Sequence, residues 1–273
     1  MQSRDVFPPG DAPAASLPEL VPIPAQGRRF SGARSPRLGD VTPKGRLRLD
    51  AVARYLQDIA NDDAIDAGLE NAMAWVVRRC EIRVERFPTF REPLDLVTFC
   101  GGYGSRWAER RTQLRGGAVP LIDAAALWVS IDAASGRPSR IPEAFVELYG
   151  EAAGGRKVGA RLQLGEPSPA TVVAAERFPL RFVDYDLLGH VNNSFAWVVA
   201  EELLSARSDL RAPLRVEAEY RGAIERGCAL AVAVDQRPDG FDAWLIDQPR
   251  GAVLVALRVG SIAGESQRNS RSR

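Results

Sequence analysis

The sequence has one histidine in 273 residues, His190, and only three cysteines. A single histidine cannot build a histidine-rich metal centre. The cysteines are odd in number and have no CxxC spacing, so they indicate neither a zinc site nor a disulfide framework. We therefore expect no metal ion and no cofactor, and the scarcity of cysteine fits a reducing, cytoplasmic setting.

A strong net charge and long apolar runs are missing as well. The 36 basic and 35 acidic residues give a formal net charge of +1, so no overall field would attract nucleic acid or an anionic membrane. No apolar run approaches the roughly 18 residues of a membrane-spanning helix, and prolines interrupt the N-terminus where a signal peptide needs an apolar core. We expect no nucleic-acid and no membrane partner. The 45% hydrophobic residues are enough for a globular core.

The apolar pattern of the first half predicts one helix followed by several strands. Residues 49–68 place Val52, Tyr55, Leu56 and Ile59 at the spacing of one buried helix face. Strand-like stretches follow at residues 74–87, 94–104, 106–117 and 121–134, and a shorter one precedes the helix at 30–38. A helix followed by neighbouring antiparallel strands indicates an α+β fold.

The same order of elements occurs again in the second half. A strand is predicted at 178–186, a helix at 194–208, and four strands at 214–224, 228–236, 242–248 and 251–262. A shift of 144 residues places Gly189 on Gly45 and Asp184 on Asp40, and a shift of 134 relates the strand 215–224 to residues 82–90. The pattern predicts two copies of a unit of roughly 110 residues. Residues 1–27 and 264–273 are expected to be poorly ordered ends, and residues 151–172 a linker.

The segment DYDLLGHVNN, residues 184–193, contains the single histidine and lies between a predicted strand and a predicted helix. One interpretation is a polar turn that ends in a helix cap. Gly189 allows a left-handed backbone angle, and Asn193 or Ser194 could cap a helix that starts near Phe195.

The other interpretation is a chemical site. Asp186 and His190 are four residues apart with Gly189 between them, so a sharp turn could bring a carboxylate and an imidazole together as an acid–base pair. Backbone N–H groups at the start of the next helix would stabilise a developing negative charge. The corresponding residues of the first copy are Thr42 and Arg46, so only one copy holds the reactive pair.

The span from Phe30 to Ile262 resembles the acyl-ACP thioesterase family. The motif DxxGHVNN, common in hotdog thioesterases, is present as Asp186, Gly189, His190, Val191, Asn192 and Asn193. In the first half, residues 74–99 and the later stretch 126–142, with its GRP.RIP pattern, are similar to the N-terminal domain of that family. The resemblance implies an α+β protein of two fused hotdog domains, each a curved antiparallel sheet wrapped around a long central helix.

The resemblance also implies an activity and domain roles. Residues 28–150 would form a non-catalytic domain that binds the acyl chain, and residues 173–263 the catalytic domain. The implied reaction is hydrolysis of a fatty acyl thioester of acyl carrier protein (ACP) or coenzyme A, in fatty acid biosynthesis. Asp186 would act as the general base or, as a second possibility, as a nucleophile. His190 would orient Asp186 or the water, and Asn192 or Asn193 would position the substrate.

Three further expectations concern the partners of such an enzyme. Leu56, Ile59, Trp75 and Trp128 are candidates to line an acyl tunnel, with ordinary core packing as the alternative. The basic runs at residues 46–48 and 106–111 could meet an acidic carrier or the phosphates of coenzyme A, with a solvated face as the alternative. Two fused hotdogs already form a pseudo-dimer, so a monomer or a homodimer is expected.

The chain departs from plant members of the family at two places. Leu188 replaces an asparagine, and Gly222-Ala223-Ile224 follow the Glu-Tyr-Arg sequence where those enzymes have a Glu-Cys pair. These departures leave open a non-catalytic acyl-binding or regulatory double-hotdog protein. An enoyl hydratase or dehydratase of the same fold is the other alternative. The hydratase motif D-x-N-P-x-H, however, has a longer Asp–His spacing and a proline, and neither occurs here.

Overall fold

The computed structural model describes residues 20–69 and 74–262. The ends predicted to be poorly ordered, residues 1–27 and 264–273, therefore lie mostly outside the described residues. The chain divides into two compact units. Unit 1 contains Met1–Ser35, Tyr55–Cys80 and Pro93–Gln163, and unit 2 contains Pro36–Arg54, Glu81–Glu92 and Leu164–Arg273. The units do not coincide with the two halves of the sequence, because two short pieces of the first half belong to unit 2.

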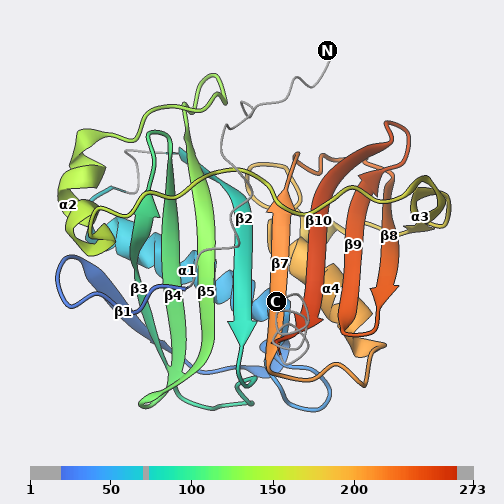
Figure 1. The fold of residues 1–273 in the computed structure, drawn as a ribbon, viewed down its shortest axis with the longest axis horizontal. Coiled ribbons are helices and arrows are strands. Elements are labelled where there is room, and N and C mark those ends of the chain that lie inside the picture. Colours follow the sequence, from blue (N-terminus) through green and yellow to red (C-terminus); the bar gives the residue numbers. More distant parts are fainter. Residues whose placement is uncertain (1–19, 70–73, 263–273) are drawn as a thin grey trace, which may run out of the picture. The chain divides into compact units, whose positions relative to one another are not determined.

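Unit 1 is a sheet with a long helix against one face (Figure 1). Its elements are β1 (Arg29–Arg34), α1 (Leu49–Asp66, from Tyr55 onwards), β2 (Ala74–Val84, up to Cys80), β3 (Leu94–Tyr103), β4 (Trp107–Gly116), β5 (Val119–Ile131) and α2 (Glu143–Ala153). The strand order is β1-β3-β4-β5-β2. Strand β3 shows the expected alternation, because Leu94 and Leu96 are buried whereas Asp95 is exposed.

Helix α2 was not predicted from the sequence. Its buried residues Phe145, Tyr149, Ala152 and Ala153 nevertheless repeat at helical spacing. Gly154 ends the helix in a left-handed conformation with φ of 56°, which glycine adopts without strain. The signal was present, but it is short and lies beside the glycine-rich stretch that was assigned to the linker.

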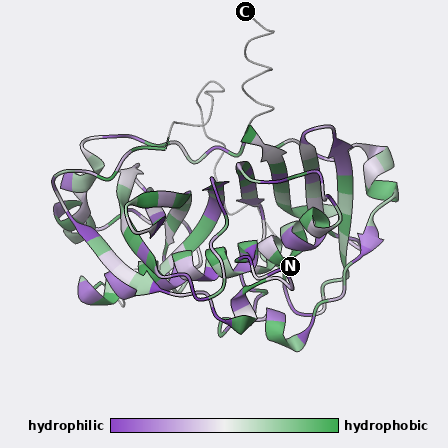
Figure 2. Cartoon of the chain, turned by 90° about the horizontal axis from the view of Figure 1, so that it is seen from below, coloured by the Kyte–Doolittle hydropathy of each residue, from purple (hydrophilic) through white to green (hydrophobic). Residues whose placement is uncertain are grey.

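Unit 2 has the same arrangement, with α4 against its sheet (Figure 1). Its elements are the 3-10 helices η1 (Leu38–Asp40) and η2 (Phe182–Asp184), α3 (Pro169–Val173), β6 (Glu176–Arg177), α4 (Phe195–Ser205), β7 (Leu214–Tyr220), β8 (Leu230–Arg237), β9 (Gly240–Asp247) and β10 (Ala252–Ser261). The strand order is β7-β10-β9-β8-β6. Hydrophobic and hydrophilic bands alternate along the strands, as half-buried strands require (Figure 2). Among the described residues, no helix is long and apolar enough to cross a membrane.

The strand predicted at residues 178–186 is wrong. Strand β6 ends at Arg177, and the following segment forms η2. Pro179 has no N–H for a sheet. The side chain of Asp184 accepts a hydrogen bond from the backbone N–H of Arg181 at 2.7 Å, which holds the chain in a tight turn. Local side-chain capping therefore overrides the apolar pattern here.

The sequence repeat is present as two matching turns in unit 2. We name residues 37–49 the first-copy turn and residues 181–193 the second-copy turn. Each begins with a 3-10 helix, and each contains a glycine with positive φ, 80° at Gly45 and 79° at Gly189. The backbone hydrogen bonds correspond at the 144-residue shift: Thr42 N to Arg46 O is 2.8 Å and Asp186 N to His190 O is 2.9 Å, while Gly45 N to Thr42 O is 2.8 Å and Gly189 N to Asp186 O is 3.0 Å. The relation between Gly45 and Gly189 is therefore confirmed.

The predicted shift of 134 for the following strand is wrong by two residues. Arg46 forms an isolated antiparallel bridge with Thr89, and His190 forms one with Glu225, so the two strand ends are related by a shift of 136. A strand has a side-chain period of two, so a slip of two residues preserves the buried face and leaves the apolar pattern almost unchanged. The pattern alone could not fix this register.

Glu217 in β7 gives a prediction for stability. It is 7% exposed, and burial, opposed by Arg215 and reinforced by Glu81, raises the pKa of its carboxyl from 4.5 to about 7. The folded protein thus retains a proton that the unfolded chain releases, so this group lowers stability as the pH rises from 4.5 to about 7. We expect Glu217→Gln to raise the free energy of unfolding at about pH 8 by about 2 kcal/mol.

Urea unfolding of this variant at two pH values checks the prediction. Near pH 4 the carboxyl is protonated in both states, so the variant and the wild type should then have the same stability. A variant less stable than wild type at about pH 8 would contradict the assignment of a raised pKa to Glu217.

Candidate active site

The second-copy turn places Asp186 and His190 at the two ends of one tight loop. Their main chains are hydrogen bonded, as described above. The Asp186 carboxylate Oδ1 accepts a hydrogen bond from the N–H of Leu188 at 2.9 Å. Within residues 20–69 and 74–262, no hydrogen bond or ion pair joins the side chains of Asp186 and His190. The direct acid–base contact expected from the spacing is therefore not made, although both residues belong to the same loop.

Glu225 lies opposite His190. The two residues form the isolated antiparallel bridge, and the N–H of Val191 donates to the carbonyl of Ile224 at 2.9 Å beside it. Directly opposed residues of an antiparallel pair project to the same face with Cβ atoms about 5 Å apart. Glu225 and His190 are both exposed.

Glu225 was not among the site residues expected from the sequence, because it does not fall in register with the Glu-Cys pair. The Glu-Cys pair of the plant enzymes falls on Ala223 and Ile224 when the Glu-Tyr-Arg sequences are matched, and Glu225 then appears out of register. The bridge to His190 shows that a carboxylate is nevertheless present at this edge of the loop. The sequence around Glu225 carries no signal for this pairing, because the tertiary fold sets it.

Asn192 organises the start of α4. Its side-chain Oδ1 accepts from the N–H of Ser194 at 2.9 Å, and its carbonyl accepts from the N–H of Phe195 at 2.9 Å. Ser194 precedes the helix as predicted, but its hydroxyl makes no capping hydrogen bond. Two of the N–H groups expected to face a substrate are therefore already satisfied by Asn192.

The N–H of Asn193 differs from its neighbours, because no acceptor for it occurs among the described residues. Its carbonyl accepts a hydrogen bond from Tyr220 Oη at 2.8 Å, and Trp197 Nε1 donates to the same Tyr220 oxygen at 3.0 Å. Buried side chains of β7 and α4 thus hold this peptide in place. A fixed N–H at the start of a helix is suited to bind an oxyanion.

In the first-copy turn, the N–H that corresponds to that of Asn193 is bound by a carboxylate of the protein itself. Leu49, which is 144 residues before Asn193, donates its N–H to Glu201 Oε2 at 3.0 Å. Arg46 donates to both oxygens of the same carboxylate, at 2.6 and 3.2 Å. The guanidinium of Arg46 also lies 4.3 Å from the centre of the Phe87 ring. An internal carboxylate and its counter-charge therefore fill the first-copy turn.

Four large apolar side chains surround the second-copy turn and face solvent. They are Phe182, Val183, Leu187 and Leu188, with exposed fractions between 72% and 96%. Leu188, which replaces the asparagine of plant relatives, contributes its backbone N–H to Asp186 and leaves its side chain outside.

The sequence matches two family profiles. Residues 31–149 match the acyl-ACP thioesterase N-terminal domain, and residues 168–256 match the acyl-ACP thioesterase C-terminal domain. Together they account for most of the chain. This protein belongs to the acyl-ACP thioesterase family. It is a thioester hydrolase, and its two units have the double-hotdog α+β fold that the resemblance implied.

The thioesterase is also similar to three other proteins. An uncharacterized protein of Mycobacterium tuberculosis is 29% identical over 240 residues, which cover 86% of this chain and 95% of that protein. The 12:0-ACP thioesterase from Umbellularia californica has a TM-score of 0.71 at 21% identity, covering 86% of this chain and 97% of that one. An acyl-ACP thioesterase from Bacteroides thetaiotaomicron has a TM-score of 0.71 at 17% identity, covering 85% and 97%. The last two comparisons show a shared fold.

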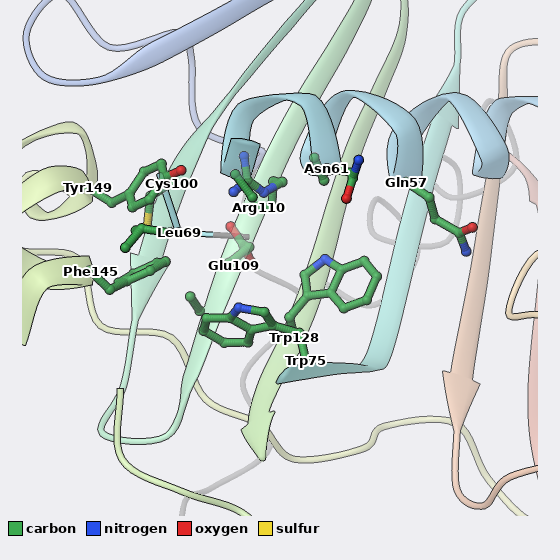
Figure 3. A pocket seen from close by; sticks show the side chains of 13 residues that line it. Gln57, Asn61, Leu69, Trp75, Cys100, Glu109, Arg110, Trp128, Phe145 and Tyr149 are labelled. Carbon is green, nitrogen blue, oxygen red and sulfur yellow. The ribbon is translucent and has the colours of Figure 1, made fainter. Parts of the chain in front are cut away.

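Unit 1 of the thioesterase contains a cavity of about 250 Å³. Of the four residues expected to line an acyl tunnel, Trp75 and Trp128 line this cavity, whereas Leu56 and Ile59 do not belong to its lining and are buried in the core. The face of α1 that lines the cavity consists of Gln57, Ala60, Asn61 and Ala64. Figure 3 shows Gln57 and Asn61 on this helix. The core face was predicted correctly from the apolar spacing, but the cavity lies along the neighbouring face, where two alanines leave room.

The basic runs are mostly neutralised within the thioesterase. Arg46 pairs with Glu201, Arg48 with Asp50, Arg110 with Asp63 and Arg111 with Asp123. These arginines therefore do not form the free anion-binding surface that the sequence analysis considered for the carrier. Among the described residues, no group of three or more His, Cys, Asp or Glu side chains could hold a metal ion.

Proposed function

We propose that the second-copy turn is the hydrolytic site and that Asp186, His190, Asn192 and Asn193 form it together with Glu225. The contrast between two otherwise matching turns carries this proposal. The second copy has Asp186, His190 and Glu225 where the first has Thr42, Arg46 and Thr89. Since the backbone hydrogen bonds are the same, folding does not require the three reactive side chains.

In the proposed mechanism, water attacks the thioester carbonyl. The water oxygen bonds to the acyl carbon while Asp186 accepts a proton from that water. The C–S bond then breaks. The leaving thiolate takes up that proton, so the products are a carboxylic acid and a thiol. The N–H of Asn193 stabilises the negative oxygen, and Asn192 keeps the turn that presents this N–H. His190, whose backbone pairs with that of Glu225, orients the water. Attack by Asp186 itself, through a mixed anhydride, is the second route.

We assign the acyl chain to the cavity of unit 1. This corresponds to the expected division into a non-catalytic domain at residues 28–150 and a catalytic domain at residues 173–263. The buried wall of the cavity is formed by Cys100, Ala108, Phe145 and Tyr149. Such a wall suits a chain that must leave water, because burying apolar surface contributes about 0.8 kcal/mol for each methylene group.

Ala60 gives a test of this assignment. It lines the cavity from α1, so Ala60→Leu should fill part of the space and shift the preferred acyl chain to a shorter length. For the longest chains that the wild type hydrolyses, we expect kcat/KM to fall by about tenfold or more. Ala118→Leu is the matched control, since Ala118 is exposed and lies outside the cavity lining. An unchanged chain-length profile in Ala60→Leu would place the acyl chain elsewhere.

The carrier in this proposal is ACP, with coenzyme A thioesters as alternative substrates, and the pathway is fatty acid biosynthesis. The exposed apolar residues around the second-copy turn offer a contact surface for the carrier. We assign the enzyme to the cytoplasm, which is supported by three cysteines that are not joined in disulfides, and we expect a monomer or a homodimer.

Product analysis by mass spectrometry tests the function as a whole. The purified enzyme is incubated with a mixed pool of acyl-ACP species and, separately, with the matching acyl-CoA species. Release of free fatty acid from ACP at a higher kcat/KM than from coenzyme A supports the proposal. If neither pool is hydrolysed while the protein remains folded, the assignment of the hydrolytic site is wrong.

A further inference from the structure

The cavity of unit 1 contains an arginine fixed among buried groups. Arg110 Nη1 donates to Asp63 Oδ2 at 2.5 Å, and Asp63, with 1% of its side chain exposed, also accepts from Arg28 Nε at 2.8 Å and from Tyr149 Oη at 2.9 Å. Burial raises the pKa of Tyr149, so its hydroxyl keeps the proton that it donates. The three partners hold Asp63, and Asp63 in turn holds Arg110.

Arg110 has more donors than acceptors around it. A guanidinium carries five N–H groups. Among the described residues, the polar partners of Arg110 are Asp63, Thr98 at 3.5 Å, and Tyr149. Its side chain is 17% exposed and lines the cavity, where it lies between α1 and the sheet (Figure 3). At least two N–H groups of Arg110 therefore remain for a molecule that occupies the cavity.

These donors make the cavity a poor site for an unsubstituted acyl chain that is long enough to reach Arg110. A saturated chain that reached Arg110 would displace water from the N–H groups and replace none of their hydrogen bonds, which costs about 1–3 kcal/mol for each buried donor. An oxygen on the chain removes this cost. Arg28 shares Asp63 with Arg110 and also pairs with Asp66, so two carboxylates balance the two arginines. A neutral oxygen is therefore the better match, and a further carboxylate would be repelled by Asp63.

We propose that the cavity selects acyl groups that carry a hydroxyl or keto oxygen on the chain over unsubstituted acyl groups of the same length. This selectivity rests on the proposed function, because it takes the cavity as the acyl site. The apolar lining by Trp75, Trp128 and Phe145 binds the hydrocarbon part, and Arg110 donates hydrogen bonds to the oxygen. Asp63 and Tyr149 are positioning residues that act through Arg110.

Matched pairs of acyl thioesters test the proposal. Chains of equal length, unsubstituted or with a hydroxyl or keto group at successive carbons, are supplied on the same carrier. For the wild type we expect kcat/KM to be at least about tenfold higher for the best oxygenated chain. Arg110→Met, which keeps the length and removes the donors, should abolish or reverse this preference. Arg110→Lys keeps the charge beside Asp63 and should give an intermediate ratio.

Two controls keep the result interpretable. Arg106→Met makes the same substitution at an exposed arginine outside the cavity lining and should retain the wild-type ratio. Thermal unfolding establishes that each variant is folded, and if Arg110→Met does not fold, Arg110→Lys carries the test. Equal or lower kcat/KM for every oxygenated chain in the wild type overturns the proposal. Preference for a chain that ends in a carboxylate overturns the assignment to a neutral oxygen.

Calorimetric titration separates this proposal from the proposed function. The free acids of the same matched chains bind without being hydrolysed, so their affinities for the wild type and Arg110→Met can be measured even if no thioester is turned over. Tighter binding of the oxygenated acid, lost in Arg110→Met, supports the cavity chemistry independently. Equal affinities contradict it, whether or not the enzyme hydrolyses thioesters.

Discussion

Replacing Asp186 with asparagine should lower kcat by about 10²–10⁴-fold and leave KM nearly unchanged. An asparagine side chain has the same shape and retains the Oδ1 that accepts from the N–H of Leu188, so the turn should persist. Only the ability to take up a proton is lost. Steady-state hydrolysis of the best acyl thioester, measured on the purified variant, checks the prediction.

Thr42→Val is the matched control for Asp186→Asn. Thr42 occupies the corresponding position of the first-copy turn, and its hydroxyl is buried without a hydrogen-bond partner among the described residues. Activity should therefore remain at the wild-type level. If kcat fell equally in the two variants, both substitutions would be lowering it by disturbing the fold. An undiminished kcat in Asp186→Asn would mean that Asp186 takes no part in the mechanism.

The second large effect concerns Arg46 and Glu201. Arg46→Met leaves the carboxylate of Glu201, with 8% of its side chain exposed, beside a helix start without its counter-charge. We expect the free energy of unfolding to fall by about 3 kcal/mol. Glu201→Gln should cost less, about 1–2 kcal/mol, because the Arg46 side chain is 28% exposed and can turn towards water. Urea unfolding near neutral pH gives both values.

Arg34→Met provides the reference for this pair. Arg34 and Asp62 form an ion pair whose side chains are 33% and 42% exposed, so its loss should cost no more than about 1 kcal/mol. If Arg46→Met were no more destabilising than Arg34→Met, Glu201 would not depend on Arg46. The double variant of Arg46 and Glu201 should recover part of the loss, because no uncompensated charge remains.

Local features of the sequence predicted the turn at Gly189 and its relation to Gly45, but the start of the second-copy turn is the 3-10 helix η2 and not the expected strand. Gly45 and Gly189 each require a left-handed backbone angle, and the acidic residue ahead of each turn caps its start. These interactions span only a few residues, so they are encoded in the order of residues. The helix α1 and the strands of unit 1 followed from apolar spacing for the same reason.

The pairing of distant residues could not be predicted in this way. Glu225 meets His190 only because a strand end returns to the turn 35 residues later, and the period of two left its register open. Arg110 and Asp63 are separated by 47 residues, and nothing in the sequence around either residue indicates that they meet. Which arginines bind carboxylates of the protein itself, and which remain free, is decided by the tertiary fold.

The carboxylate that Glu201 places on the N–H of Leu49 has a consequence for turnover. A released fatty acid carries the same functional group, and the N–H of Asn193 occupies the matching position in the second-copy turn. Under the proposed mechanism, the product would therefore bind where the negatively charged oxygen of the reaction forms, in competition with the next thioester. In the first-copy turn the corresponding N–H, that of Leu49, is already bound by the carboxylate of Glu201, which is part of the chain and is not released.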